Sequence, residues 1–251
     1  MSGWRCNGGY LGPRPTGPST SAASGWWDSR SQFRNRRDGQ WPIVGDPHWD
    51  SVVLLLQDSL EDESSRNQAV TVSGDAAIST AQVKVGTHSL AFDNSGDRLT
   101  FPAGSDFAFG TGDYTVETWI YILPHSTTNQ VRVLSTSNSS SNFSFEVLSA
   151  GTLRMWTGSN LLNFGGNVTR ESWHHVAFCR SGGTVRAFVD GLIVGGPVSN
   201  STNMINNQSV QTPSTNAYPC PACYLDSFRI TKGIARYTAN FTPPSAPHPI
   251  G

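Results

Sequence analysis

The sequence predicts an all-β protein in which two antiparallel sheets pack as a jelly-roll sandwich. Residues 172–191 form two β-rich segments around Gly182-Gly183, and they end in Asp190-Gly191, a dipeptide that favours a tight hairpin turn. The 251 residues include 25 Gly and 15 Pro, and only 14% are charged. Ordinary soluble domains contain about 25% charged residues, so this composition favours short strands and many turns. A β sandwich of about 200 to 250 residues commonly forms one domain.

The individual strands follow from the hydrophobic pattern. Val52–Leu56 is a continuous apolar run, and residues 113–123 are apolar on both alternating faces, which is typical of a strand covered on two sides. Residues 88–92 and 98–101 predict a hairpin around a turn-forming loop. Further strands are expected at residues 130–134, 142–148, 153–156 and 223–231.

A polar stretch interrupts this pattern before the last strand. Of the 18 residues from 199 to 216, 14 are Ser, Thr, Asn or Gln. Such a stretch predicts a long polar loop rather than a part of the core.

Three of these segments resemble a known family. The hairpin at residues 172–191, the unit at residues 88–101 and the ending at residues 224–244 are similar to laminin G-like domains, which are related to concanavalin A-type lectins, pentraxins and some glucanases. Residues 24–42 also resemble the leader that precedes such domains in structural proteins of tailed phages.

The resemblance implies a concanavalin A-like jelly roll with an appended arm. We expect an N-terminal docking arm at residues 1–47, a laminin G-like domain at residues 48–245 and a tail at residues 246–251.

The N-terminal arm differs in charge from the rest of the chain. Residues 1–47 carry six Arg and three Asp, which leaves 11 of the 17 basic and 15 of the 18 acidic residues for the remainder. Residues 26–37 have the spacing of a short amphipathic helix. Disordered leaders, the alternative, are usually poor in aromatic residues, whereas Trp, Phe and Arg commonly anchor interfaces. We therefore predict docking through Trp26, Trp27, Arg30, Phe33, Arg34, Arg37 and Trp41.

The predicted location and partners follow from charge and from hydropathy. A net charge of −1 favours neither nucleic acid nor an anionic membrane as a partner. The first 30 residues contain no secretory apolar segment, and no run approaches the roughly 18 apolar residues of a membrane span. With the phage-type leader, these features predict a virion protein that is assembled in the host cytoplasm, contacts other virion proteins and forms a homo-oligomer.

The cysteines do not indicate a metal or redox site. Cys220 and Cys223 have the spacing of half a zinc site, but no second close pair or nearby His accompanies them. A thioredoxin-like role would need a βαβ pattern, so a reduced or locally bridged loop is the better interpretation. Cys179 lies within a predicted strand and is expected in the core.

The carboxylates give no sign of an enzyme. Glycoside hydrolysis needs two carboxyl groups about 5 Å or about 6.5 to 9.5 Å apart, and related glucanases place such a cluster on one strand. This chain has only five Glu: Glu61 and Glu63 fall in a predicted turn, and Glu117 stands alone on its strand. His174 and His175 belong to the family hairpin and are expected to be structural. We therefore predict no enzymatic activity.

One structural Ca²⁺ is implied by the resemblance, since relatives hold such an ion with Asp and loop carbonyls. The candidates are Asp50 before the first strand, Asp93 and Asp97 in the loop, and Asp226 in the closing strand, which is the preferred one. The alternative is that these side chains cap turns or form local hydrogen bonds, as Asp commonly does.

A saccharide-binding surface would combine aromatic rings with polar donors at their edges. Trp119, Tyr121, Arg154 and Trp156 would form one if they faced the same side of the sandwich. The alternative is that the large aromatic residues belong to the core.

These observations predict a bacteriophage structural protein, such as a tail or neck fibre or a head decoration, whose lectin-like domain adheres to host-surface saccharide. Multiple copies would raise avidity without tight single sites. The alternatives are an architectural virion protein that binds no saccharide and, less favoured, a carbohydrate-active hydrolase.

Overall fold

The computed structural model describes residues 45–124, 130–136, 143–204, 208–213 and 220–251. Residues His48–Ile250 form one compact unit, which is built almost entirely of strands. The elements are η1 (Trp49–Ser51), β1 (Val52–Leu56), β2 (Thr71–Ser73), β3 (Ala77–Ser79), β4 (Ser89–Phe92), β5 (Arg98–Phe101), η2 (Ser105–Phe107), β6 (Tyr114–Ile122), β7 (Val131–Thr136), β8 (Ser144–Val147), β9 (Leu153–Trp156), β10 (Leu161–Gly165), β11 (Trp173–Ser181), β12 (Thr184–Val189), β13 (Leu192–Ser199), β14 (Val210–Thr212) and β15 (Cys223–Lys232). Within the described ranges, no helix is long and apolar enough to cross a membrane.

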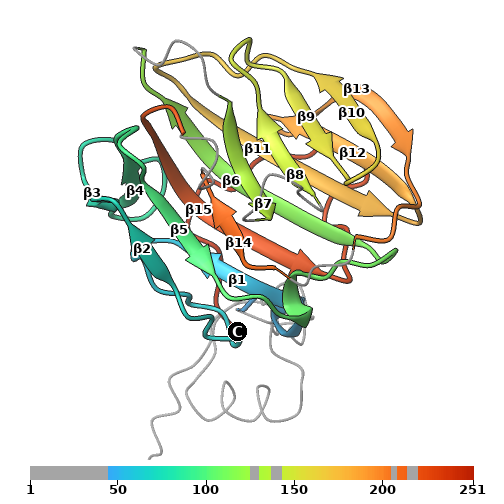
Figure 1. Cartoon of the computed structure of the whole chain (residues 1–251), viewed down its shortest axis with the longest axis horizontal. Helices are drawn as coiled ribbons and strands as arrows, with labels where there is room; N and C mark the ends of the chain where they lie inside the picture. Colours follow the sequence, from blue (N-terminus) through green and yellow to red (C-terminus); the bar gives the residue numbers. More distant parts are fainter. Residues whose placement is uncertain (1–44, 125–129, 137–142, 205–207, 214–219) are drawn as a thin grey trace, which may run out of the picture. The chain divides into compact units, whose positions relative to one another are not determined.

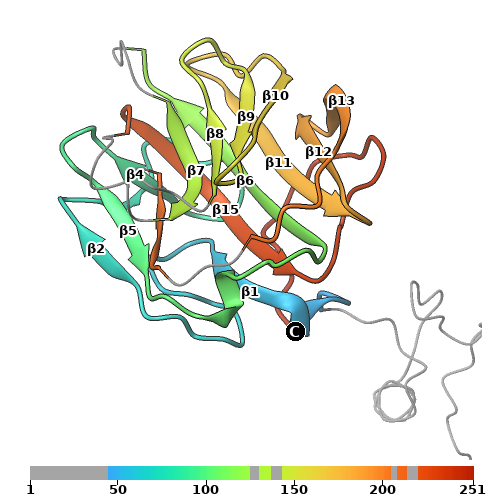
Figure 2. The ribbon, with the colours of Figure 1, turned by 45° about the vertical axis from the view of Figure 1, so that its right-hand side comes forward.

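The strands form two antiparallel sheets that stack face to face (Figures 1 and 2). Sheet A has eight strands in the order β13-β12-β11-β6-β15-β4-β3, and β1 also pairs with β15. Sheet B has seven strands in the order β10-β9-β8-β7-β14-β5-β2. The all-β sandwich predicted from the sequence is therefore confirmed, and its last strand β15 pairs with its first strand β1.

The core fills the space between the two sheets. Because side chains alternate along a strand, Tyr114, Val116 and Ile120 of β6 enter the core, while Thr115, Glu117 and Trp119 lie on the opposite face of the strand. Phe145 of sheet B and Phe178 of sheet A meet there with ring centroids 5.2 Å apart.

The hairpin formed by β11 and β12 also agrees with the prediction. Its strands pair antiparallel from Val176 to Ser181, and the chain then turns at Asp190 and Gly191, whose φ angles are 51° and 78°. A Cβ on Gly191 would meet the carbonyl oxygen of Phe241 at 2.0 Å. Both the turn and the packing therefore require glycine at this position.

The predicted hairpin at residues 88–101 is wrong. β4 belongs to sheet A and β5 to sheet B, so the intervening loop is a corner that carries the chain from one sheet to the other. The carboxylate of Asp97 fixes this corner, because it accepts hydrogen bonds at 2.8 Å from the backbone N–H groups of both Asp93 and Asp75.

The polar stretch 199–216 also differs from the predicted loop. Its residues Val210–Thr212 form β14, a fully buried strand between β5 and β7. Gln211 donates a side-chain hydrogen bond of 3.1 Å to Thr100. Pairing on both sides satisfies the backbone, so this strand does not need an apolar sequence.

The C-terminal strap, defined here as residues 233–250, covers one half of the outer face of sheet A. Tyr237 and Phe241 of the strap stack with ring centroids 3.5 Å apart and pack around Phe188 of β12. Farther along, Trp119 Nε1 of β6 donates a hydrogen bond of 3.1 Å to the carbonyl of Pro244. The strap thus gives this half of the sheet a second, smaller hydrophobic layer.

A buried carboxylate lies beneath the strap. Glu117 of β6 is fully buried, and Arg229 of β15 donates to its Oε1 from Nε at 2.9 Å and from Nη2 at 2.7 Å. The Tyr237 hydroxyl donates to Oε2 at 2.8 Å, and His175 Nε2 lies 3.3 Å from the same oxygen. Glu117 is the single carboxylate on β6, as the sequence indicated, and its partners come from β15, the strap and β11.

The protonation states in this layer follow from burial. Desolvation alone would raise the pKa of Glu117, but the Arg229 charge and the His175 contact outweigh it and hold the pKa well below its usual value. Burial lowers the pKa of His248 to about 4, although the charge of Glu117 opposes this shift. At neutral pH the layer therefore contains one ion pair and an uncharged His248.

We predict that Glu117→Gln destabilises the fold by about 3 to 5 kcal/mol, because it removes the charged partner of the buried Arg229. Urea denaturation measures this change in the free energy of unfolding. The matched variant Glu61→Gln, at an exposed position, should change it by less than about 0.5 kcal/mol. Equal free energies of unfolding for the two variants would contradict the buried ion pair between Glu117 and Arg229.

We also predict that stability falls with acid between pH 6.5 and pH 4. The pKa of His248 is lower in the folded protein than in the unfolded chain, so its contribution is complete above pH 6.5 and is lost as the pH falls toward 4. The loss attributable to this residue is about 3 kcal/mol at most. Urea denaturation at pH 7, 5.5 and 4 measures the free energy of unfolding. His248→Gln should reduce the dependence of this free energy on pH, and an unchanged dependence would refute the prediction.

Candidate functional site

A row of three aromatic side chains lies where the strap leaves sheet A uncovered. Trp173 of β11, Tyr121 of β6 and Tyr224 of β15 occupy one register line across three adjacent strands. The ring centroids of Trp173 and Tyr121 are 5.6 Å apart, and those of Tyr121 and Tyr224 are 6.1 Å apart. All three side chains are half-buried, so parts of their rings remain accessible. We call these three residues the aromatic row.

The alternation of β6 explains why the row faces outward. Tyr121 follows Glu117 and Trp119 on the same face of the strand, while Ile120 and Ile122 enter the core. The strap covers Glu117 and Trp119 and leaves Tyr121 outside. The row is therefore the uncovered continuation of a face whose other half is sealed.

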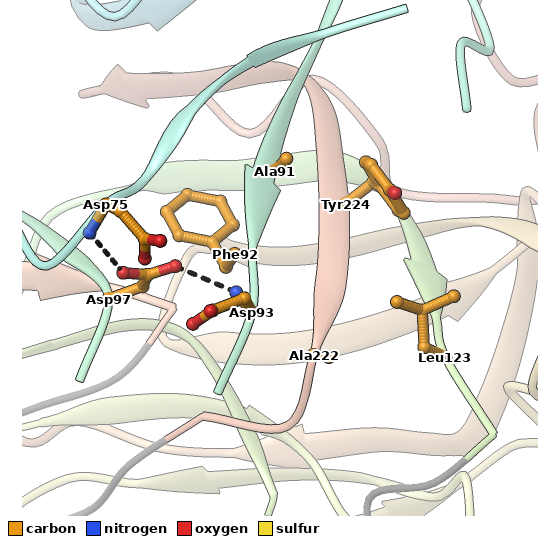
Figure 3. A pocket seen from close by; sticks show the side chains of 8 residues that line it. All are labelled: Asp75, Ala91, Phe92, Asp93, Asp97, Leu123, Ala222 and Tyr224. Atoms are coloured by element: carbon orange, nitrogen blue, oxygen red, sulfur yellow. Dashed lines mark hydrogen bonds between the residues drawn. The ribbon is translucent and has the colours of Figure 1, made fainter. Parts of the chain in front are cut away.

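A pocket of about 290 Å³ adjoins the row at Tyr224. Figure 3 shows its lining, with Tyr224 and Leu123 at one side and three carboxylates that point toward one another at the other. Its lining residues are Asp75, Ala91, Phe92, Asp93, Asp97, Leu123, Ala222 and Tyr224. We call it the acidic pocket.

The three carboxylates of the acidic pocket have different surroundings. Asp97 is 2% exposed, and both of its oxygens accept backbone hydrogen bonds, which makes it the residue that shapes the corner. A Cβ on Gly74, whose φ is 74°, would meet Asp97 Oδ1 at 2.1 Å, so glycine is required beside it. Asp75 and Asp93 are exposed, and their carboxylates remain available to a ligand.

The carboxylate cluster has the chemistry of a Ca²⁺ site. One ligand oxygen each from Asp75, Asp93 and Asp97 lies within 4.8 Å of the other two, and Ca²⁺ prefers such hard oxygen ligands. These residues would hold the ion, and the ion would neutralise the repulsion among the three carboxylates. The structural Ca²⁺ implied by the family resemblance stays a prediction.

The other two candidate metal residues lie elsewhere. Asp50 belongs to η1, and its backbone carbonyl accepts a hydrogen bond of 3.0 Å from Arg66. Asp226 accepts hydrogen bonds from the backbone N–H groups of Lys84 at 2.9 Å and Val85 at 3.0 Å. Burial raises the pKa of Asp226, and these hydrogen bonds oppose the shift. Asp226 thus anchors the loop before β4 through hydrogen bonds that are long-range in sequence, whereas the alternative expected local ones.

The four residues predicted to form one saccharide surface lie on two different sheets. Trp119 and Tyr121 belong to β6 of sheet A, whereas Arg154 and Trp156 belong to β9 of sheet B. Trp119 is 7% exposed and contacts the strap, with Lys84 Nζ 4.3 Å from the centroid of its ring. Of the two sheet A residues, Tyr121 is therefore the more exposed one.

On sheet B, Arg154 is part of a polar network. Its Nε donates to Glu146 Oε2 at 2.6 Å, and Ser144 Oγ donates to Glu146 Oε1 at 2.7 Å. Arg132 Nε lies 3.4 Å from the same Oε1. Trp156 pairs opposite Ser144 on β8 and is half-buried. This face is a second polar surface of the sandwich, and it is separate from the aromatic row.

The predicted residues of the docking arm, from Trp26 to Trp41, lie outside the described residues. The cysteine predictions can be compared with the structure. Cys220 and Cys223 are free thiols with their sulfur atoms 3.5 Å apart, and Cys179 is a buried free thiol. Cys220 precedes β15, and Cys223 is the first residue of that strand.

Sequence reasoning missed Trp173, Tyr224 and Asp75 as parts of the site. The alternation of side chains could have indicated Trp173 and Tyr224, because each lies on the outward face of a predicted strand. What the sequence lacked was the order of the strands, which places β11, β6 and β15 side by side. Asp75 lies outside any predicted strand and joins the pocket only through the corner held by Asp97.

The sandwich with an aromatic row and a polar pocket defines a lectin-like β-sandwich. A family model described as the concanavalin A-like lectin/glucanases superfamily matches residues 93–232, more than half of the chain. The chain therefore belongs to this superfamily. No curated protein sequence matches it significantly.

Several solved structures share the fold at low sequence identity. The binding domain of Paraclostridial Mosquitocidal Protein 1 is 13% identical with a TM-score of 0.59, and the match covers 73% of this chain and 49% of that chain. A botulinum neurotoxin type C structure, described as interacting with two ganglioside molecules, is 15% identical with a TM-score of 0.58, and the match covers 74% and 49%. This chain thus spans about half the length of these toxin chains.

A smaller protein matches over nearly its whole length. Domain 4 of AbnA, an extracellular arabinanase from Geobacillus stearothermophilus in complex with arabinotriose, is 15% identical with a TM-score of 0.58. The match covers 74% of this chain and 94% of that chain. These likenesses show a shared sandwich fold.

Proposed function

We propose that the protein is a non-enzymatic saccharide-binding module that a phage particle displays through the N-terminal arm. The aromatic row beside the acidic pocket carries this proposal, because it presents partly exposed aromatic side chains next to polar acceptors. Aromatic faces stack on the C–H faces of sugar rings, and polar groups at the edge orient the hydroxyls. The solved structures that interact with gangliosides or hold arabinotriose support a saccharide as the ligand.

The shallow site suits weak binding that is strengthened by multiple copies. Strands in a sheet lie about 4.8 Å apart, so the three rings span roughly 10 Å, enough to contact more than one sugar ring. A single site of this kind has limited affinity. Several copies on one particle would raise the overall affinity without further contacts at each site.

The architectural alternative explains the fold but not the uncovered row. The strap seals the other half of this sheet face with apolar packing, while Tyr121 and Tyr224 remain accessible. The glutamates on the sheets give the hydrolase alternative no support, because Glu117 and Glu146 are both buried and ion-paired. Saccharide binding is therefore the function that this geometry supports best.

We predict that Trp173→Ala and Tyr224→Ala each weaken saccharide binding by about tenfold or more, because each removes a stacking face. The full-length chain, biotinylated at its N-terminus and clustered on streptavidin, is applied to a glycan array. The matched control is Trp156→Ala, which removes a half-buried aromatic residue of sheet B. Loss of binding in Trp156→Ala but not in Trp173→Ala would place the site on sheet B and contradict the proposal.

For the arm, we predict that deletion of residues 1–47 leaves a soluble, folded body that no longer enters particles. Circular dichroism measures the fold, and immunoblotting of purified particles measures incorporation. A variant in which Trp26, Trp27 and Trp41 are replaced by Ala should show the same defect, since these residues are the predicted anchors. Normal incorporation of the truncated chain would refute the role of the arm.

A further inference from the structure

We propose that the acidic pocket makes the site selective for neutral or amino saccharides and excludes sialylated and uronic ones. This inference rests on the proposed saccharide-binding function and names the ligand class of the same site. It follows from three carboxylates that converge on a pocket whose other wall is Tyr224, the end of the aromatic row (Figure 3).

The three carboxylates of the acidic pocket differ in the hydrogen bonds that they accept. Asp97 is committed to the corner, since both of its oxygens accept backbone N–H groups. Asp93 Oδ1 accepts from the backbone N–H of Ser95, which leaves its other oxygen for a ligand. Among the described residues, nothing donates a hydrogen bond to the carboxylate of Asp75. The pocket therefore offers acceptor atoms that are held in place by the backbone.

The carboxylate oxygens of the pocket determine which ligand groups can bind there. An ionised carboxylate accepts hydrogen bonds and donates none, so a saccharide group that binds directly to Asp75 and Asp93 must bring donors. Sugar hydroxyls and the ammonium group of an amino sugar are such donors. The carboxylate of a sialic or uronic acid is another acceptor, and it would be repelled by the like charges around it.

Two arginines, Arg98 and Arg170, lie next to residues that line the pocket. Arg98 follows Asp97, and its Nη1 donates to the carbonyl of Gly96 at 3.0 Å. Arg170 Nη1 donates to the carbonyl of Leu123 at 2.9 Å. Each guanidinium group thus donates one N–H to a backbone carbonyl, and neither arginine belongs to the lining of the pocket. Within the part of the chain that the structure describes, the centre of the pocket is lined by carboxylates and by apolar or aromatic groups.

The aromatic row and the acidic pocket together orient the ligand. The C–H faces of successive rings lie along Trp173, Tyr121 and Tyr224, and the end of the chain enters the acidic pocket with its hydroxyl or amino groups toward Asp75 and Asp93. A substituent that carries negative charge at this end is the group that the site rejects.

The test uses the full-length chain clustered on streptavidin and an array that pairs each neutral or amino saccharide with its sialylated or uronic counterpart. Binding is measured in chelator and again with added Ca²⁺. The double variant Asp75→Asn/Asp93→Asn removes two charges from the pocket, and Asp50→Asn is the matched control at an exposed site outside it. Thermal unfolding confirms that all variants are folded.

In chelator, we expect the wild-type chain to bind at least one neutral or amino saccharide at least about tenfold more tightly than its acidic counterpart. The double variant should lose most of this discrimination and bind the preferred saccharide about tenfold more weakly, while Asp50→Asn should behave as wild type. Preference for acidic saccharides, discrimination that persists in the double variant, or binding that requires Ca²⁺ would overturn this inference alone. Silence of the wild-type chain across the array would overturn the proposed function as well.

Discussion

The fold depends most on the seal that the C-terminal strap makes over one half of sheet A. Its centre is Glu117, a fully buried carboxylate that receives hydrogen bonds from Arg229 of the last strand and Tyr237 of the strap. A buried charge is tolerated only when it is paired and hydrogen-bonded, so strand and strap are fixed together by one residue of β6. The stacked rings of Tyr237 and Phe241 then exclude water from the pair.

The same seal determines which part of the sheet is left for binding. Trp119 and Tyr121 are two residues apart on one face of β6, yet Trp119 contacts the strap through Pro244 and Tyr121 lies beyond it. The aromatic row begins where the strap no longer covers the sheet. One half of this sheet face thus stabilises the fold, and the other half is open to a ligand. The corner held by Asp97 supplies the polar groups beside the open half.

The sequence was sufficient for the fold class and for the features set by local chemistry. The turn at Asp190-Gly191 and the apolar phases of β6 are encoded by neighbouring residues, and the structure confirms them. Long-range pairing could not be predicted in this way. The loop at residues 93–97 has the composition of a hairpin turn, but a hydrogen bond to Asp75 makes it a corner, and the polar β14 becomes a strand only because two neighbours flank it.

The site shows the same limit. Tyr121 was predicted from its aromatic ring, whereas Trp173 and Tyr224 join it only through the strand order, and Arg154 lies on the other sheet. The most direct measurement is therefore an NMR titration of the isotope-labelled chain with a neutral or amino oligosaccharide that it binds on the array. The account predicts that chemical-shift changes cluster at Trp173, Tyr121 and Tyr224 and extend to Asp93. Changes that cluster instead around Arg154 and Trp156 would contradict it.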